Sequence, residues 1–191
     1  GLPSNVEPPD DANQRWLDHL KYEIVPPTID PPETNTELPN LQPFLTGDPF
    51  IQIVHPTILA LRDEILQNTA TPKEQAQAIY NWIWLNIKKI PVLSFPSALD
   101  VANTREGDCN EHTVLFTAIA RSAGIPTRMA IGVVWSDDLN GFYYHAWPEV
   151  YIDQWLPMDP TLGQPIADAT HIKFLEGDMN TWPELVSYLG Q

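Results

Sequence analysis

The chain has 191 residues and a single cysteine, which excludes an intrachain disulfide framework and a zinc site built from cysteines alone. Its formal net charge of -15 disfavours nucleic acid and anionic membrane surfaces as partners. No apolar run reaches the roughly 18 residues that a membrane span needs, and no basic-then-apolar segment opens the sequence. We therefore expect no signal peptide in this stretch, and membrane attachment only through segments outside it.

Residues 1–55 are predicted to form a proline-rich arm that is mostly extended. Half of the 20 prolines fall in residues 1–50, and each proline fixes φ and removes a backbone donor. One short helix is expected at 11–20, where Trp16, Leu17 and Leu20 form a partial apolar stripe. The arm holds too many apolar residues for a free linker, so we expect it to pack along the domain, with its first ten residues loose.

Residues 56–191 are predicted to be a catalytic domain that begins with helices. Apolar residues at helical spacing mark a first helix from 58 to about 68. Thr71 is placed to cap a second helix, whose wide apolar face indicates burial and which ends near Ile87. A connecting loop follows at 90–106, with one helical turn expected at 97–102.

The only cysteine opens the third main helix. Gly107 and Asp108 suit the end of a loop and the cap of a helix, and Gly124 followed by Pro126 ends that helix. Cys109 is therefore expected in the first turn. Unpaired N–H groups and the helix dipole favour a thiolate there, so the sequence predicts a lowered thiol pKa.

After this helix the hydrophobic period changes from helical to alternating. Asn140-Gly141 is a hairpin turn signal between two segments rich in β-branched and aromatic residues. Strands are predicted at 127–135, 142–153, 155–158 and 170–175, with a closing helix at 181–189. Helices first and an antiparallel sheet afterwards indicate an α+β fold.

Three residues in this half of the chain carry chemistry together. Thiol catalysis needs an imidazole to hold or take the proton, and a carboxylate to fix the tautomer of that imidazole. Cys109, His145 and Asp159 supply these groups, the last two on neighbouring strands. Taken singly, each has an ordinary structural interpretation: a small buried residue, a core histidine and a turn aspartate.

The stretch GDCNEHTVLFTAIARSAGIPTRMAIGVV at 107–134 resembles the core of the transglutaminase-like superfamily, in its bacterial branch. Two later blocks also match, His145-Ala146-Trp147-Pro148-Glu149-Val150 and the segment 155–161. The match is strong over 107–161 and looser from about 56 to about 177. The resemblance implies a papain-like fold in which Cys109, His145 and Asp159 are nucleophile, base and orienting residue.

The activity implied is acyl transfer or hydrolysis at amide bonds of a peptide or protein, through a thioester and without a cofactor. A bacterial setting and the lack of an identifiable amine site favour a peptidase or amidase over a cross-linking enzyme. Family members often sit in the cell envelope, so a periplasmic or extracellular location is expected, with the cytoplasm still open.

The oxyanion that forms in such a reaction must be stabilised by hydrogen-bond donors. The Cys109 N–H is one, since it lies at a helix start, but the second cannot be assigned from the sequence. The candidates for the oxyanion site and the substrate cleft are Trp82, Trp84, Asn103, Asn110 and Trp147. Trp82 and Trp84 also fit an interpretation as core residues.

Other interpretations predict different chemistry. A non-catalytic protein-binding module could use the same fold. A zinc site could join His112 to Cys109, His145 and Asp159, but it would occupy the nucleophile, and we predict no metal. Arg128 and Glu149 are expected to pair across the hairpin and hold the sheet.

Overall fold

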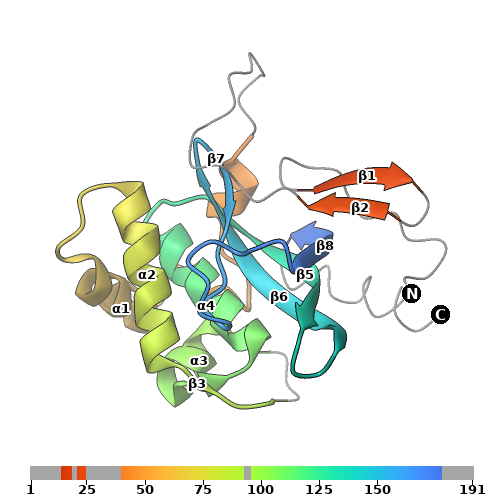
Figure 1. Cartoon of the computed structure of the whole chain (residues 1–191). Helices are drawn as coiled ribbons and strands as arrows, with labels where there is room; N and C mark the ends of the chain where they lie inside the picture. Colours follow the sequence, from red (N-terminus) through yellow and green to blue (C-terminus); the bar gives the residue numbers. More distant parts are fainter. Residues whose placement is uncertain (1–13, 19–20, 25–39, 93–95, 178–191) are drawn as a thin grey trace.

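The computed structural model describes residues 14–18, 21–24, 40–92 and 96–177 (Figure 1). Within these ranges a short 3-10 helix, η1 (Gln42–Leu45), precedes α1 (Pro56–Leu66), α2 (Pro72–Asn86), α3 (Ala98–Thr104) and α4 (Cys109–Ser122). The strands are β1 (Gln14–Asp18), β2 (Lys21–Ile24), β3 (Lys88–Lys89), β4 (Glu106–Gly107), β5 (Thr127–Ser136), β6 (Gly141–Ile152), β7 (Gln154–Pro157) and β8 (His171–Gly177). The order of helices followed by sheet confirms the α+β prediction.

Side-chain caps fix where the two long helices begin. Thr71 accepts a hydrogen bond from the Glu74 N–H, and the Glu74 side chain accepts one in return, which is a capping box at the start of α2. Asp108 and Glu111 make the same reciprocal pair at the start of α4. These caps satisfy amides that the helix itself leaves unpaired, so both helix starts follow from local sequence.

The main sheet has four antiparallel strands in the order β7-β6-β5-β8. β5 and β6 pair from Thr127 opposite Val150 to Ser136 opposite Gly141. Their turn spans 137–140 and places Asn140 in the left-handed region at φ 49°, which asparagine tolerates well. All four strands lie close to their predicted positions.

Helix α4 is the buried centre of the domain. It packs against α1, α2 and α3 on one side and against β5 and β6 on the other (Figure 1). Every residue from Cys109 to Arg121 is buried. The core around it contains Ile58, Ile79, Ile83, Leu115, Phe116, Ile119, Met129 and Val150. A helix enclosed in this way has little freedom to shift, which holds its first residue in place.

The segment 40–55 lies against this core. Ile51 is fully buried, and the Ala98 N–H donates to the Phe50 carbonyl at 2.7 Å. The Arg121 guanidinium donates to the Thr46 carbonyl at 2.7 Å. This part of the predicted arm is therefore packed on the domain, whereas the division of the chain at residue 55 stays a prediction.

The expected helix at 11–20 is wrong. Residues 14–18 form β1, which pairs with β2 in an antiparallel ribbon with Trp16 opposite Tyr22. The apolar stripe at 11–20 is too short to establish a helical period, and aromatic and β-branched residues favour strands once a partner strand is available. The expected loose segment 1–10 and the helix at 181–189 fall outside the described residues.

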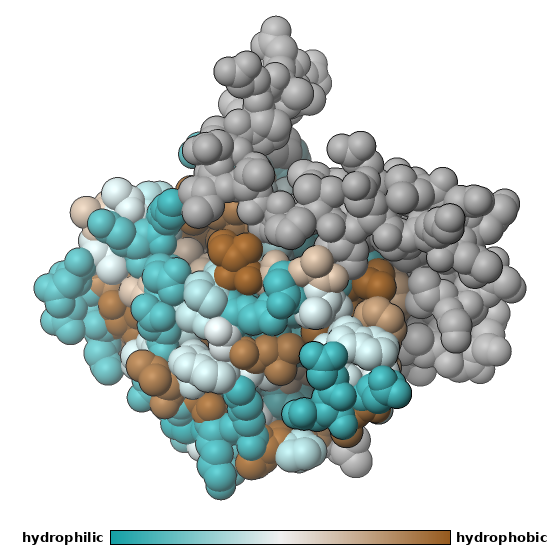
Figure 2. Space-filling model, in the orientation of Figure 1, coloured by the Kyte–Doolittle hydropathy of each residue, from teal (hydrophilic) through white to brown (hydrophobic). Residues whose placement is uncertain are grey.

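The described surface is mainly hydrophilic on the face shown in Figure 2, where apolar side chains appear as small separate patches. Large apolar side chains with high exposure include Val54, Leu85, Leu139 and Phe142. No helix in the described ranges has both the length and the apolar character to cross a membrane.

Candidate active site

Cys109 is the first residue of α4, as the sequence predicts, and only 8% of its surface is exposed. The predicted lowering of its pKa is wrong. Burial raises the pKa of the Cys109 thiol to about 12, and the negative charges of Asp108, Asp159 and Glu111 add to that effect. The Ala146 N–H, which faces the thiol, acts in the opposite direction. Loss of water outweighs the helix terminus, so the free thiol keeps its proton.

Strand β6 brings His145 beside the start of α4. The Tyr144 hydroxyl donates to the Asn110 side chain at 2.8 Å, and the Thr113 hydroxyl donates to the Ala146 carbonyl at 3.1 Å. These contacts join Asn110 and Thr113, both in the first turns of α4, to the two residues on either side of His145. The cysteine and the histidine are therefore neighbours in space, although they are far apart in sequence.

Asp159 follows β7 and is completely buried. Its Oδ1 accepts hydrogen bonds from the N–H groups of Thr161 and Leu162 at 2.7 and 2.9 Å. Its Oδ2 accepts one from His145 Nε2 at 2.7 Å. This bond occupies Nε2 and leaves His145 Nδ1 as the nitrogen that can exchange a proton.

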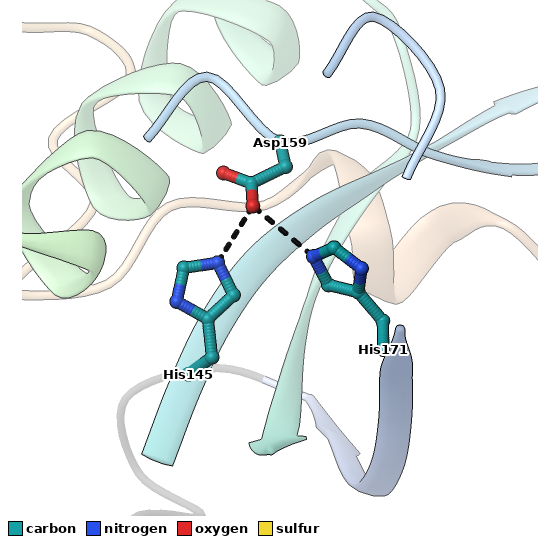
Figure 3. Close-up of side chains that lie close together, drawn as sticks. All are labelled: His145, Asp159 and His171. Atoms are coloured by element: carbon teal, nitrogen blue, oxygen red, sulfur yellow. Dashed lines mark hydrogen bonds and ion pairs between the residues drawn. The ribbon is translucent and has the colours of Figure 1, made fainter. Parts of the chain in front are cut away.

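His171, at the start of β8, also donates to Asp159 Oδ2, through Nε2 at 3.1 Å. Figure 3 shows both imidazoles pointing at the same carboxylate oxygen. Burial by itself would raise the pKa of Asp159, but the hydrogen bonds and charges of the two histidines outweigh burial and hold that pKa well below its ordinary range. The carboxylate is therefore ionised at neutral pH.

His171 was not among the site residues predicted from the sequence. A strand was predicted there, but no motif marks this histidine. Its contact with Asp159 depends on the pairing of β8 with β5, on the edge of β5 that faces away from β6. The only available signal was a histidine at the start of a predicted strand, which is a weak one. His145, Asp159 and His171 place their ligand atoms within 4.8 Å of one another. Among the described residues His112 is not in this group; its Nδ1 bonds instead to the Asp108 carbonyl at 2.6 Å.

Trp147 packs against both imidazoles. Its ring lies 6.0 Å from that of His145 in a stacked arrangement and 4.9 Å from that of His171, edge to face. Only 2% of Trp147 is exposed. Trp147 is therefore buried against the two rings, and its predicted place in the substrate cleft stays a prediction.

The remaining candidates lie in different settings. Trp82 is partly buried beneath the guanidinium of Arg105, 4.3 Å away. Trp84 is 39% exposed, and its ring lies against Gly163 in the loop after Asp159. Asn103 is exposed on α3, whereas Asn110 is buried and bonded to Tyr144. Of the two tryptophans, Trp84 lies against the loop that carries the carboxylate.

Tyr80, on α2, lies near Asp159 and was not among the site residues predicted from the sequence. Burial raises the pKa of its hydroxyl, and the negative charge of Asp159 raises it further. The hydroxyl therefore lies within electrostatic reach of that carboxylate. Helix α2 packs on both α4 and β6, the elements that carry Cys109 and His145.

The predicted pair of Arg128 and Glu149 is confirmed, with Arg128 Nε 2.7 Å from Glu149 Oε2. Lys173 on β8 joins them at 3.1 Å from the same oxygen. All three side chains are almost completely buried. This network links β5, β6 and β8, the strands that carry or adjoin the two histidines, so its role is to hold the sheet.

Comparisons with known proteins show a family and solved structures to which this chain is similar. A family model described as the Transglutaminase-like superfamily matches residues 59–160. A crystal structure of a candidate cysteine protease from Cytophaga hutchinsonii is similar with a TM-score of 0.63 and 26% identity, covering 72% of this chain and 46% of that one. The periplasmic domain of TgpA from Pseudomonas aeruginosa gives a TM-score of 0.49 and 24% identity, covering 63% of this chain and 46% of that domain.

This chain thus spans less than half of the length of each of those two structures. A comparison with curated proteins finds no match.

Proposed function

The chain belongs to the transglutaminase-like superfamily, and we propose that it is a thiol enzyme that acts on amide bonds of peptides or proteins. The observation that carries the proposal is the hydrogen bond of 2.7 Å between His145 Nε2 and Asp159 Oδ2, on a histidine flanked by contacts to the start of α4. Similarity to a candidate cysteine protease over 72% of the chain supports the same reaction class.

The proposed reaction starts from a neutral thiol and a neutral imidazole. Cys109 Sγ attacks the carbonyl carbon of the amide while His145 Nδ1 takes the thiol proton. Asp159 keeps the other ring proton on Nε2 and stabilises the imidazolium that forms. The imidazolium then protonates the leaving amine, the C–N bond breaks, and a thioester remains on Cys109. Water or a second amine, deprotonated by His145, releases the acyl group and restores the thiol.

The tetrahedral intermediate carries an oxyanion beside the first turn of α4. The Cys109 N–H is the first donor, as expected for a helix start. We assign the second donor to the Tyr80 hydroxyl, because the charge of Asp159 acts on it and α2 contacts both elements that carry the nucleophile and the base. Tyr80→Phe is expected to lower kcat by about 100-fold and leave KM within a few-fold. An unchanged kcat would instead favour the Trp84 indole N–H as the second donor.

Hydrolysis is the preferred outcome and transfer to an amine is the second. The fate of the thioester depends on access of water to the site, and none of the described residues forms an identifiable amine site. An envelope or extracellular location remains a prediction from the family resemblance.

The test is direct capture of the thioester. Wild-type protein is incubated with a mixture of peptides, quenched in acid and digested, and the peptide that contains Cys109 is analysed by mass spectrometry. We expect an acyl adduct on Cys109 in wild type and none in Cys109→Ala or His145→Ala. His55→Asn, a substitution far from these residues in sequence that keeps the cap of α1, should behave as wild type.

Addition of a fluorescent primary amine separates the two outcomes, since transfer labels the peptide and hydrolysis does not. A wild-type protein that forms no adduct with any peptide and binds one protein tightly would support the non-catalytic binding module instead.

A further inference from the structure

The buried imidazoles of His145 and His171 contact the same oxygen of the buried Asp159 carboxylate (Figure 3). We propose that His145, Asp159 and His171 form a binding site for a divalent transition-metal ion, zinc foremost, and that the bound ion switches catalysis off. The binding itself is independent of the proposed function; the inhibition rests on it.

The ligand set is one that zinc prefers. Two histidine nitrogens and one carboxylate oxygen, with a fourth position open to water, are a common zinc environment. Ligand atoms in a tetrahedral zinc site lie roughly 3.3 Å apart, given bonds of about 2.0–2.1 Å. Here the two Nε2 atoms lie 2.7 and 3.1 Å from Asp159 Oδ2. Small movements of the two rings would therefore open space for an ion.

The surroundings of the cluster already suit a metal. Asp159 uses Oδ1 to accept two backbone N–H groups, so Oδ2 is the oxygen that faces the imidazoles. His171 Nδ1 lies 3.3 Å from the Asp168 carbonyl and 3.5 Å from the Asp168 carboxylate. A histidine whose outer nitrogen faces a carbonyl or carboxylate is the usual partner arrangement of a metal ligand.

Metal binding would remove the base from the reaction. A metal ion needs the lone pair of Nε2, so the proton of each neutral ring moves from Nε2 to Nδ1. Protonated Nδ1 of His145 cannot accept the proton of Cys109. Because Cys109 is not a ligand of the proposed site, the thiol stays unmodified while the enzyme is inactive.

The experiment uses protein freed of metal with a chelator. Co²⁺ is added as a spectroscopic probe, because its visible absorption reports a four-coordinate site, and Zn²⁺ binding is measured by calorimetry. We expect one ion per chain in wild type. Cys109→Ala should bind with an affinity within threefold of wild type. His171→Ala should lose about 100-fold or more, since loss of only an outer partner already costs about 10- to 100-fold.

His171→Gln serves if His171→Ala does not fold, because glutamine retains a donor for Asp159. His55→Asn is the matched control and should bind as wild type does. No Co²⁺ spectrum in wild type overturns the proposal, and so does binding that is lost in Cys109→Ala and kept in His171→Ala, which would place the ion on the thiol. Binding is read without any substrate, so its failure is distinguishable from failure of the proposed reaction.

Discussion

Replacing Asp159 by asparagine tests the central contact of the site. The substitution preserves size and leaves one carbonyl oxygen to accept the N–H groups of Thr161 and Leu162. The new NH₂ group faces two imidazole N–H donors, so both rings must turn to their other tautomer or lose their bonds. A hydrogen bond to a charged group contributes about 1.5–3 kcal/mol, and two are lost here. We expect Asp159→Asn to lower the free energy of unfolding by about 3 kcal/mol.

Catalysis should fall further than stability. In the other tautomer His145 carries its proton on Nδ1, where it cannot accept the proton of Cys109. A tautomer error of this kind lowers kcat by about 10³- to 10⁴-fold. The pH dependence of the unfolding free energy gives an independent readout. The lowered pKa of Asp159 stabilises the folded state above the ordinary aspartate pKa near 4, and that stabilisation is lost as the pH falls from there toward the pKa of the folded state. Asp159→Asn should remove this acid-side loss.

Urea denaturation at pH 7 and at about pH 2.5 measures the effect on stability, and turnover of the peptide identified by the adduct experiment measures catalysis. Asp138→Asn is the control, since Asp138 is exposed in the turn between β5 and β6. It should change stability by less than about 0.5 kcal/mol. An Asp159→Asn protein as stable and as active as this control would refute the argument.

Three further predictions follow from the geometry. Because the pKa of the Cys109 thiol is raised to about 12, alkylation by iodoacetamide should be slow at pH 7 and should rise steadily beyond pH 9; a plateau below pH 8 would indicate a preformed thiolate. Burial first, and Asp108 second, raise the pKa of Glu111 to about 7, so folding favours its protonated form. Wild type should therefore lose about 2–3 kcal/mol of unfolding free energy as the pH rises from 4.5 to 7. Glu111→Gln should flatten that slope in pH-dependent urea melts, and an unchanged slope would assign it to another group. An added Cβ at Gly132 would lie 1.9 Å from the Ile172 carbonyl oxygen, so Gly132→Ala should lower the stability measured in thermal melts by at least about 2 kcal/mol. An added Cβ at Gly124 meets no atom within 4 Å, so Gly124→Ala should cost about 1 kcal/mol, from the positive φ alone. Equal melting temperatures for the two variants would contradict the close approach of β5 and β8.

Several features of this protein could be predicted because their causes are local. Asp108 caps α4 through its own neighbours, so Cys109 had to be the first helical residue. The alternating pattern on either side of Asn140 set the β5–β6 hairpin, and the register of that hairpin set the pair of Arg128 and Glu149. Causes of this kind lie in residues close together in the sequence, so the sequence is enough to reveal them.

The short hairpin near the start of the chain shows the limit of such reasoning. Its few apolar residues fit a helix or a strand equally, and the presence of β2 as a partner decided the outcome. The same limit applied to the substrate cleft. Trp147 belongs to a matching motif, yet only packing showed that its ring faces the two histidines and is almost completely buried.

The sequence by itself determined the fold class and the start of the cysteine helix, and it supplied the three residues that we propose as the catalytic triad. The tertiary structure alone decided the protonation of the thiol and the second histidine on the carboxylate. Burial is a property of the assembled core, and it reversed the effect that the helix terminus predicts for Cys109. His171 reaches Asp159 only because β8 pairs with β5, a contact between strands 35 or more residues apart that no local pattern records.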